Sequence, residues 1–192
     1  MVAECIARRS LLLAGLALMG SGCVPSIRDL GGPSPTTLDR RFERQRVAYD
    51  SSEPAGSIVV DTSERFLYTI ESGGYAMRYG VGVGQEGLTL KGRATIGRKA
   101  VWPSWTPSAS MIRRKPRLAQ YAGGVPGGPN NPLGARALYL YRGGDDTRFR
   151  IHGTNEPWTI GTAVSSGCIR MTNDDVIDLY DRTPEGTAVM VL

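Results

Sequence analysis

The chain has 192 residues, 25 of them glycine and 12 proline, and its formal net charge is +5. This length suffices for one domain with its own core plus a short extension, and the composition favours strands and turns over long helices. The charge excess is small and no basic helix or aromatic–basic motif accompanies it, so we expect no nucleic-acid partner.

The N-terminus carries the features of an export signal. Arg8 and Arg9 form a positively charged start, and the apolar run from Leu11 to Met19 is too short to span a bilayer. Small residues then lead to Cys23, in an order that resembles a lipoprotein signal and implies lipidation of that cysteine. An ordinary cleaved signal is the alternative, because Gly20 stands where lipoprotein signals usually carry leucine. Either form directs the protein to the periplasm or cell envelope, and lipidation would anchor it to a membrane.

Three parts follow from these patterns along the chain. Residues 1–23 form the signal peptide, of the lipoprotein type. Residues 24–55 are rich in proline, serine, arginine and aspartate, which predicts a flexible tether. Residues 56–192 form the folded domain, and we find no internal repeat.

Most of the predicted elements in this domain are strands. β-branched and aromatic residues bounded by glycine, serine and aspartate mark them, and they lie at residues 57–61, 65–70, 75–83, 138–141, 149–152 and 186–192. One helix is predicted, capped by Thr172 or Asn173, with Asp174 and Asp175 in its first turn and its end near Arg182.

A long irregular segment, residues 97–133, separates two groups of predicted strands. It contains Trp102, Trp105 and a basic run at residues 113–117. A loop of this length inside a domain is usually functional, so we expect a rim over a groove for an extended, partly anionic substrate. A solvated surface loop is the alternative.

The glycines of the segment Gly82–Gly87 match the spacing of a dinucleotide-binding turn. Such a turn must open a helix, whose N-terminus faces the pyrophosphate. The residues that follow instead predict loop and strand, so we expect these glycines to permit tight turns and close strand packing.

One cysteine and one histidine are the candidate reactive groups. Signal cleavage removes Cys5 and lipidation would use Cys23, which leaves Cys168 as a single thiol in an exported protein. His152 is the only histidine, and an imidazole beside a thiol can accept its proton. A buried inert cysteine and a structural histidine are the alternatives. A zinc site would need further ligands at a spacing that the sequence lacks, so we expect no metal.

The segment His152-Gly-Thr-Asn, a spacer, and Ser165-Ser-Gly-Cys-Ile-Arg-Met171 resemble the signature of the L,D-transpeptidases of the YkuD type. The stretches Asn131–Gly134 and Ala137–Leu140 are also similar to the residues that precede that signature. The resemblance covers residues 56–192. It implies a mainly β, sandwich-like domain with one or two short helices, and a reaction that needs no cofactor.

The resemblance also implies roles for individual residues. Cys168 would attack a tetrapeptide stem of peptidoglycan and release D-alanine, and an amine of a second stem would take the acyl group. His152 would be the base, oriented by the backbone carbonyl of Gly153. The backbone N–H groups of Gly167 and Cys168 would form the oxyanion hole.

Other residues are expected at the substrate or beside it. Arg170 would contact a substrate carboxylate or order the loop, and a structural arginine tied to backbone carbonyls is the alternative. Ser165 would support the cysteine, and Trp102 and Trp105 would line the groove. Many family members have a histidine where this chain has Ser166, which puts fine tuning of the site in doubt.

Rival functions use the same residues differently. With water as the acceptor, the enzyme would be a carboxypeptidase or an amidase. With a lysine side chain as the acceptor, it would attach a protein to the wall. A lipoprotein that binds peptidoglycan without catalysis is the remaining alternative.

Overall fold

The computed structural model describes residues 38–85, 88 and 90–192, which fall within one compact unit. The expected signal peptide and the lipidated Cys23 lie outside the described residues. Within the described part of the chain, no helix is both long and apolar enough to cross a bilayer.

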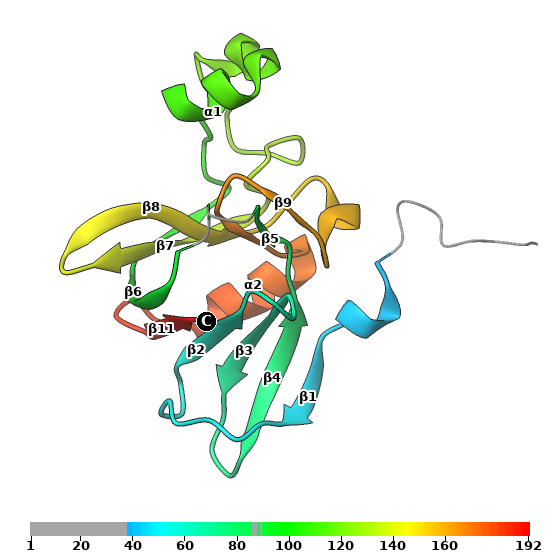
Figure 1. The fold of residues 1–192 in the computed structure, drawn as a ribbon, viewed down its shortest axis with the longest axis vertical. Helices are drawn as coiled ribbons and strands as arrows, with labels where there is room; N and C mark the ends of the chain where they lie inside the picture. The colour runs from blue at the N-terminus through cyan, green and yellow to red at the C-terminus, as the bar shows by residue number, and fades with distance from the viewer. Residues whose placement is uncertain (1–37, 86–87, 89) are drawn as a thin grey trace, which may run out of the picture. The chain divides into compact units, whose positions relative to one another are not determined.

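Most of the described strands belong to one mixed sheet of nine strands, in the order β1-β4-β3-β2-β11-β6-β7-β8-β10 (Figure 1). These strands are β1 (Gln45–Ala48), β2 (Ile58–Asp61), β3 (Phe66–Ile70), β4 (Tyr75–Gly80), β6 (Gly92–Val101), β7 (Arg136–Arg142), β8 (Asp145–His152), β10 (Ile169–Arg170) and β11 (Ala188–Val191). A second, two-stranded sheet pairs β5 (Val83–Gly84) with β9 (Ala163–Ser165).

Two short α-helices accompany the strands, α1 (Ala109–Arg114) and α2 (Asn173–Arg182). The Thr172 hydroxyl caps α2 by accepting a hydrogen bond from the backbone N–H of Asp175 at 3.2 Å, as the sequence predicts. Three short 3-10 helices complete the described elements: η1 (Arg40–Phe42), η2 (Pro116–Tyr121) and η3 (Pro157–Thr159).

The main core draws on both halves of the nine-stranded sheet. Ile58 and Leu67 come from β2 and β3, Leu138 and Ile151 from β7 and β8, and α2 adds Leu179, all of them fully buried in one cluster. The two halves therefore enclose a common apolar interior, whose burial is the main stabilising contribution to the fold. This confirms the predicted mainly β, sandwich-like architecture with short helices.

The predicted tether is wrong at its C-terminal end. Residues 45–48 form β1 and pair antiparallel with β4, so that Ala48 lies opposite Tyr75. Just before this strand, Phe42 is 4% exposed, and its ring lies where a side chain on Gly161 would have to be. The sequence shows few apolar residues here, so it predicted little contact with the core. The contact comes from Phe42, whose ring packs against Gly161, 119 positions away in the chain.

The segment 97–133 is also more ordered than the sequence predicts. Strand β6 runs through its first five residues, and α1 and η2 lie further along. Gly97 is an extra residue in the β6–β7 pairing, since Ile96 lies opposite Leu140 and Arg98 opposite Tyr139. A glycine here suggests a strand break by sequence, but its missing side chain leaves room for the ring of Tyr141.

Candidate active site

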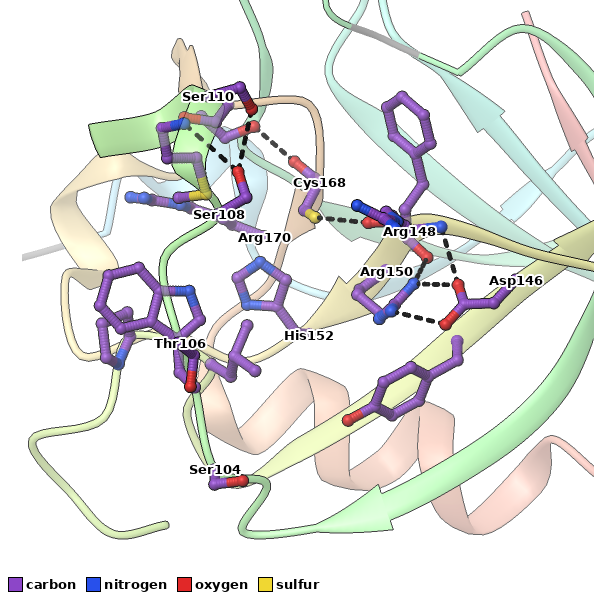
Figure 2. Close-up of a pocket in the computed structure, with 18 of the residues that line it drawn as sticks. Ser104, Thr106, Ser108, Ser110, Asp146, Arg148, Arg150, His152, Cys168 and Arg170 are labelled. Atoms are coloured by element: carbon purple, nitrogen blue, oxygen red, sulfur yellow. Dashed lines mark hydrogen bonds and ion pairs between the residues drawn. The ribbon is translucent and has the colours of Figure 1, made fainter. Parts of the chain in front are cut away.

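A cavity of about 550 Å³ contains both Cys168 and His152 in its wall (Figure 2). His152 ends β8, and Cys168 lies in the turn between β9 and β10. Strand β10 pairs parallel with β8 and places Arg170 opposite His152 in register. This pairing is what brings two residues sixteen positions apart to the same cavity.

The imidazole of His152 is held in one orientation by the backbone. Its ring is 4% exposed, and Nδ1 lies 2.6 Å from the carbonyl oxygen of Gly153. A carbonyl only accepts hydrogen bonds, so Nδ1 must carry the proton. In the neutral ring Nε2 then keeps a free lone pair, which is the state that a general base requires.

Burial also keeps this imidazole neutral. Loss of solvent, followed by the charge of Arg170, lowers the pKa of His152 to about 3. The charge of Arg150 acts in the same direction, and the carbonyl of Gly153 acts in the opposite one. His152 is therefore uncharged at neutral pH.

The thiol of Cys168 is neutral at rest as well. Burial raises the pKa of this thiol above its ordinary value, although the backbone N–H of Arg150 and the charges of Arg150 and Arg170 act in the opposite direction. A neutral thiol beside a neutral imidazole implies that the proton moves when the sulfur attacks, rather than beforehand.

Ser165 fixes the turn that carries the cysteine. Its hydroxyl donates to the carbonyl oxygen of Cys168 at 2.6 Å and accepts from the N–H of Gly167 at 3.1 Å. The supporting part expected of Ser165 fits this geometry. The prediction for Gly167 needs correction, because its N–H is already bonded to Ser165 and does not point freely at an oxyanion.

Gly167 is required for another reason. Its φ angle is 128°, and a Cβ there would lie 2.5 Å from the carbonyl oxygen of Leu88 and 2.8 Å from the ring of Phe149. Only glycine has ready access to such a backbone conformation.

Arg170 lines the cavity but is tied to the protein. Its guanidinium donates to Glu156 at 2.9 Å and approaches the hydroxyl of Thr159 at 3.4 Å. These partners are side chains, whereas the structural alternative expected backbone carbonyls. Contact with a substrate carboxylate stays a prediction. Arg170 also lines a second cavity, of about 480 Å³, which shares Trp105, Met111, Pro132 and Ser166 with the first.

The two tryptophans of the predicted rim have different positions. Trp105 lies in the wall of both cavities, together with Met111 of α1. Trp102 lines neither of them and is 41% exposed, so its contact with substrate stays a prediction. From the basic run, Arg114 lines the first cavity and Arg117 the second, which places that run at the rim.

Sequence reasoning missed one wall of the cavity. It is formed by the β7–β8 hairpin, whose lining residues are Tyr139, Asp146, Arg148, Phe149 and Arg150. Apolar and polar side chains do not alternate regularly along these residues, so the sequence predicts an exposed hairpin here. The spacing of an aspartate four residues before an arginine was the one available signal that two of them are paired.

Gly82 and Gly84 of the dinucleotide-like segment serve strand packing, as expected, and Gly87 lies outside the described residues. Gly82 forms a bridge with Arg170, and Val83–Gly84 is strand β5. A Cβ on Gly82 would lie 2.8 Å from the carbonyl oxygen of Thr159. Among residues 38–85, 88 and 90–192, no group of three or more histidine, cysteine or acidic side chains could hold a metal ion.

Comparison with known proteins gives consistent matches. The family model for the YkuD-type L,D-transpeptidase catalytic domain matches residues 55–191. A putative L,D-transpeptidase from the ATP synthase subunits region of Fuscovulum blasticum is 30% identical over 96% of this chain and 97% of its own length. The probable L,D-transpeptidase ErfK/SrfK of Escherichia coli K12 is 36% identical over 70% of this chain, and the match spans only 43% of that protein.

Among solved structures, one from Brucella melitensis is 50% identical, with a TM-score of 0.55. It covers 81% of this chain and 96% of its own, and is described as a probable carnitine operon oxidoreductase. That description applies to the Brucella protein.

Proposed function

Because this chain belongs to the family of YkuD-type L,D-transpeptidase catalytic domains, we propose that it joins peptidoglycan stem peptides by acyl transfer through a thioester at Cys168. The observation that carries the proposal is the shared cavity of Cys168 and His152, in which the carbonyl of Gly153 leaves Nε2 of His152 free to accept a proton. A thiol and an oriented base are the two groups that this chemistry needs.

The first half of the reaction forms the acyl-enzyme. The sulfur of Cys168 attacks the carbonyl carbon of the third stem residue, while Nε2 of His152 takes the thiol proton. The tetrahedral intermediate collapses as its C–N bond breaks, and the imidazolium returns the proton to the leaving D-alanine. Because Gly167 is engaged with Ser165, the N–H of Cys168 is the donor that we assign to the developing oxyanion.

The second half transfers the acyl group. The amine of a neighbouring stem attacks the thioester carbonyl and gives a proton to Nε2 of His152. The carbon–sulfur bond breaks, the sulfur takes the proton back, and the thiol is regenerated. Arg114, Arg117 and Arg170 surround the two cavities with positive charge, which supports binding of the carboxylates of stem peptides.

Export is part of the same proposal. Residues 1–23 would direct the protein to the periplasm, and lipidation of Cys23 would hold it at a membrane. Because η1 and β1 belong to the folded unit, the tether would connect Cys23 only to the start of η1. The expected substrate, peptidoglycan, is found in that compartment.

The acceptor distinguishes the proposal from its nearest rivals. Water in place of the amine would give a carboxypeptidase or an amidase, and a lysine of a wall-attached protein would give an anchoring enzyme. All three share the acyl-enzyme at Cys168, whereas a binding protein without catalysis would form no acyl-enzyme.

Incubation with purified tetrapeptide muropeptides, followed by chromatography and mass spectrometry, tests the proposal. Wild-type protein should release D-alanine and produce tripeptide–tetrapeptide dimers, and Cys168→Ala should do neither. Tripeptide monomers alone would favour the carboxypeptidase. An unchanged substrate with correctly folded wild-type protein would favour the binding protein.

A further inference from the structure

A bulge in strand β8 forms the wall beside the nucleophile. Tyr139 lies opposite Arg150 in the β7–β8 pairing, and Tyr141 lies opposite Asp146. Three residues of β8, Thr147–Phe149, therefore face the single residue Leu140 of β7. Arg148, in the middle, has a positive φ of 64°, which is strained for a residue other than glycine.

The bulge touches both the reactive sulfur and the turn that carries it. The carbonyl oxygen of Arg148 lies 4.0 Å from Sγ of Cys168 and accepts a weak hydrogen bond from the thiol, which holds the sulfur in place; Figure 2 marks this contact. The backbone N–H of Arg150 lowers the pKa of the thiol, although burial outweighs this effect. The ring of Phe149 packs against Gly167 so closely that a Cβ on Gly167 would be 2.8 Å from it.

One ion pair joins the two ends of the bulge. The guanidinium of Arg150 donates to both carboxylate oxygens of Asp146, at 2.7 and 2.9 Å, and also to the carbonyl of Phe149 at 2.9 Å. The same carboxylate accepts from the backbone N–H of Arg148 at 2.7 Å. The guanidinium lies 4.3 Å from the centre of the Tyr139 ring, which limits its movement.

This ion pair makes more contacts, and is less exposed at Arg150, than an ordinary surface ion pair. The side chain of Arg150 is 16% exposed, and the pair is bidentate, which gives it a fixed geometry. Without the carboxylate, the N–H of Arg148 and the guanidinium would both lose a partner. The strained Arg148 would then have less to hold it in place.

We infer that Asp146 and Arg150 act as positioning residues, whose ion pair holds the bulge 147–149 against Cys168 and thereby fixes the position from which its sulfur reacts. The inference rests on the proposed function only in naming Cys168 as the nucleophile. The ion pair does not contact the bond that the reaction forms or the bond that it breaks. It acts by holding the carbonyl of Arg148 against the sulfur and the ring of Phe149 against the turn at Gly167.

A change at Asp146 separates this positioning from a simple effect of charge. Through space, the carboxylate of Asp146 disfavours the thiolate, whereas Arg150 and Arg170 favour it. If charge alone mattered, Asp146→Asn would make the thiol more reactive. If positioning matters, the same variant loosens the bulge and makes the thiol less reactive.

The experiment measures alkylation of Cys168 by iodoacetamide in the full-length protein from pH 6 to 10. Peptide mass spectrometry distinguishes Cys168 from the other two cysteines. We expect Asp146→Asn to lower the alkylation rate at pH 8 by about tenfold or more. An unchanged or faster rate in the folded variant would overturn the inference.

Two further variants keep the test decisive. Arg150→Lys retains the charge but loses the two-pronged contact, so we expect it to show the same loss; retention of the wild-type rate would contradict positioning. Asp145→Asn removes the adjacent exposed carboxylate and should leave the rate unchanged. Near-ultraviolet circular dichroism establishes folding, and if Asp146→Asn does not fold, Arg150→Lys decides alone.

This readout does not depend on the substrate. If muropeptides are not converted by wild-type protein but the variants still alter alkylation, the proposed function fails and the inference stands. If muropeptides are converted equally by all variants and alkylation is unchanged, the inference fails and the proposed function stands.

Discussion

Nδ1 of His152 lies 2.6 Å from the carbonyl oxygen of Gly153, the residue that follows it in the chain. A contact between adjacent residues needs no distant partner, so the β8 backbone that ends at His152 is enough to set the tautomer. The result is a base whose free nitrogen is available to a thiol in the same cavity.

Replacement of His152 by glutamine should remove the base without removing a hydrogen-bond donor to Gly153. We expect the turnover rate on tetrapeptide muropeptides to fall by roughly 100- to 10,000-fold, the usual contribution of a general base. KM should change by only a few-fold, since Nε2 acts on the thiol proton and not on substrate binding. A variant that keeps more than a tenth of the wild-type turnover would show that another group removes the proton.

Acid should destabilise the wild-type fold through the same histidine. The pKa of His152 is about 3 in the folded state and near 6.5 in the unfolded chain, so its contribution is present above pH 6.5 and is lost as the pH falls toward 3. Between pH 7 and pH 5 the free energy of unfolding should drop by about 2 kcal/mol on this account. Urea titrations at both pH values measure the drop.

His152→Gln is the control for this loss, because the chain has no other histidine. The variant should lose about 2 kcal/mol less between pH 7 and pH 5 than wild type does. Equal losses in both proteins would mean that His152 is not buried in its neutral form.

Alanine at position 167 should disturb the cysteine turn. The φ angle of 128° and the contacts that a Cβ would make with Leu88 and Phe149 predict a cost of about 1–3 kcal/mol in the free energy of unfolding. Alkylation of Cys168 should slow as the turn shifts. Gly123→Ala is the matched control, since a Cβ there meets nothing within 4 Å; similar effects of the two variants would argue against a special geometry at Gly167.

The segment before the matched family region should contribute to stability. Phe42→Ala removes a ring that is 4% exposed and packs 5.4 Å from the ring of Phe66, and core changes of this kind cost about 3–5 kcal/mol. Thermal unfolding of the full chain measures the loss, and Phe42→Leu should recover more than half of it. If Phe42→Ala left the unfolding temperature unchanged, residues 38–48 would not stabilise the domain and would act only as a tether.

The sequence could predict the elements that rest on local patterns. The strands β2, β3, β4, β7, β8 and β11 follow from β-branched and aromatic residues between turn residues, and α2 follows from its cap and its acidic first turn. The candidate site was also within reach, because one cysteine and one histidine remained after the signal was set aside.

What the sequence could not predict depends on distant contacts. In the sequence Gly97 suggests a strand break, whereas in the structure it makes room for the ring of Tyr141. Phe42 is a lone apolar residue in the sequence, whereas in the structure its ring packs against Gly161. The bulge at Thr147–Phe149 depends on pairing with Leu140, which no local pattern contains. Trp102 and Trp105 look equivalent in sequence, and only the course of the chain separates them.

The central claim, that Cys168 becomes acylated, is tested most directly by mass spectrometry of the protein mixed with a tetrapeptide muropeptide and no acceptor amine. The account predicts a covalent adduct at Cys168 with the mass of the muropeptide less D-alanine, and none in Cys168→Ala. Release of D-alanine at the wild-type rate by Cys168→Ala, or turnover by wild-type protein with the adduct on another residue, would contradict it.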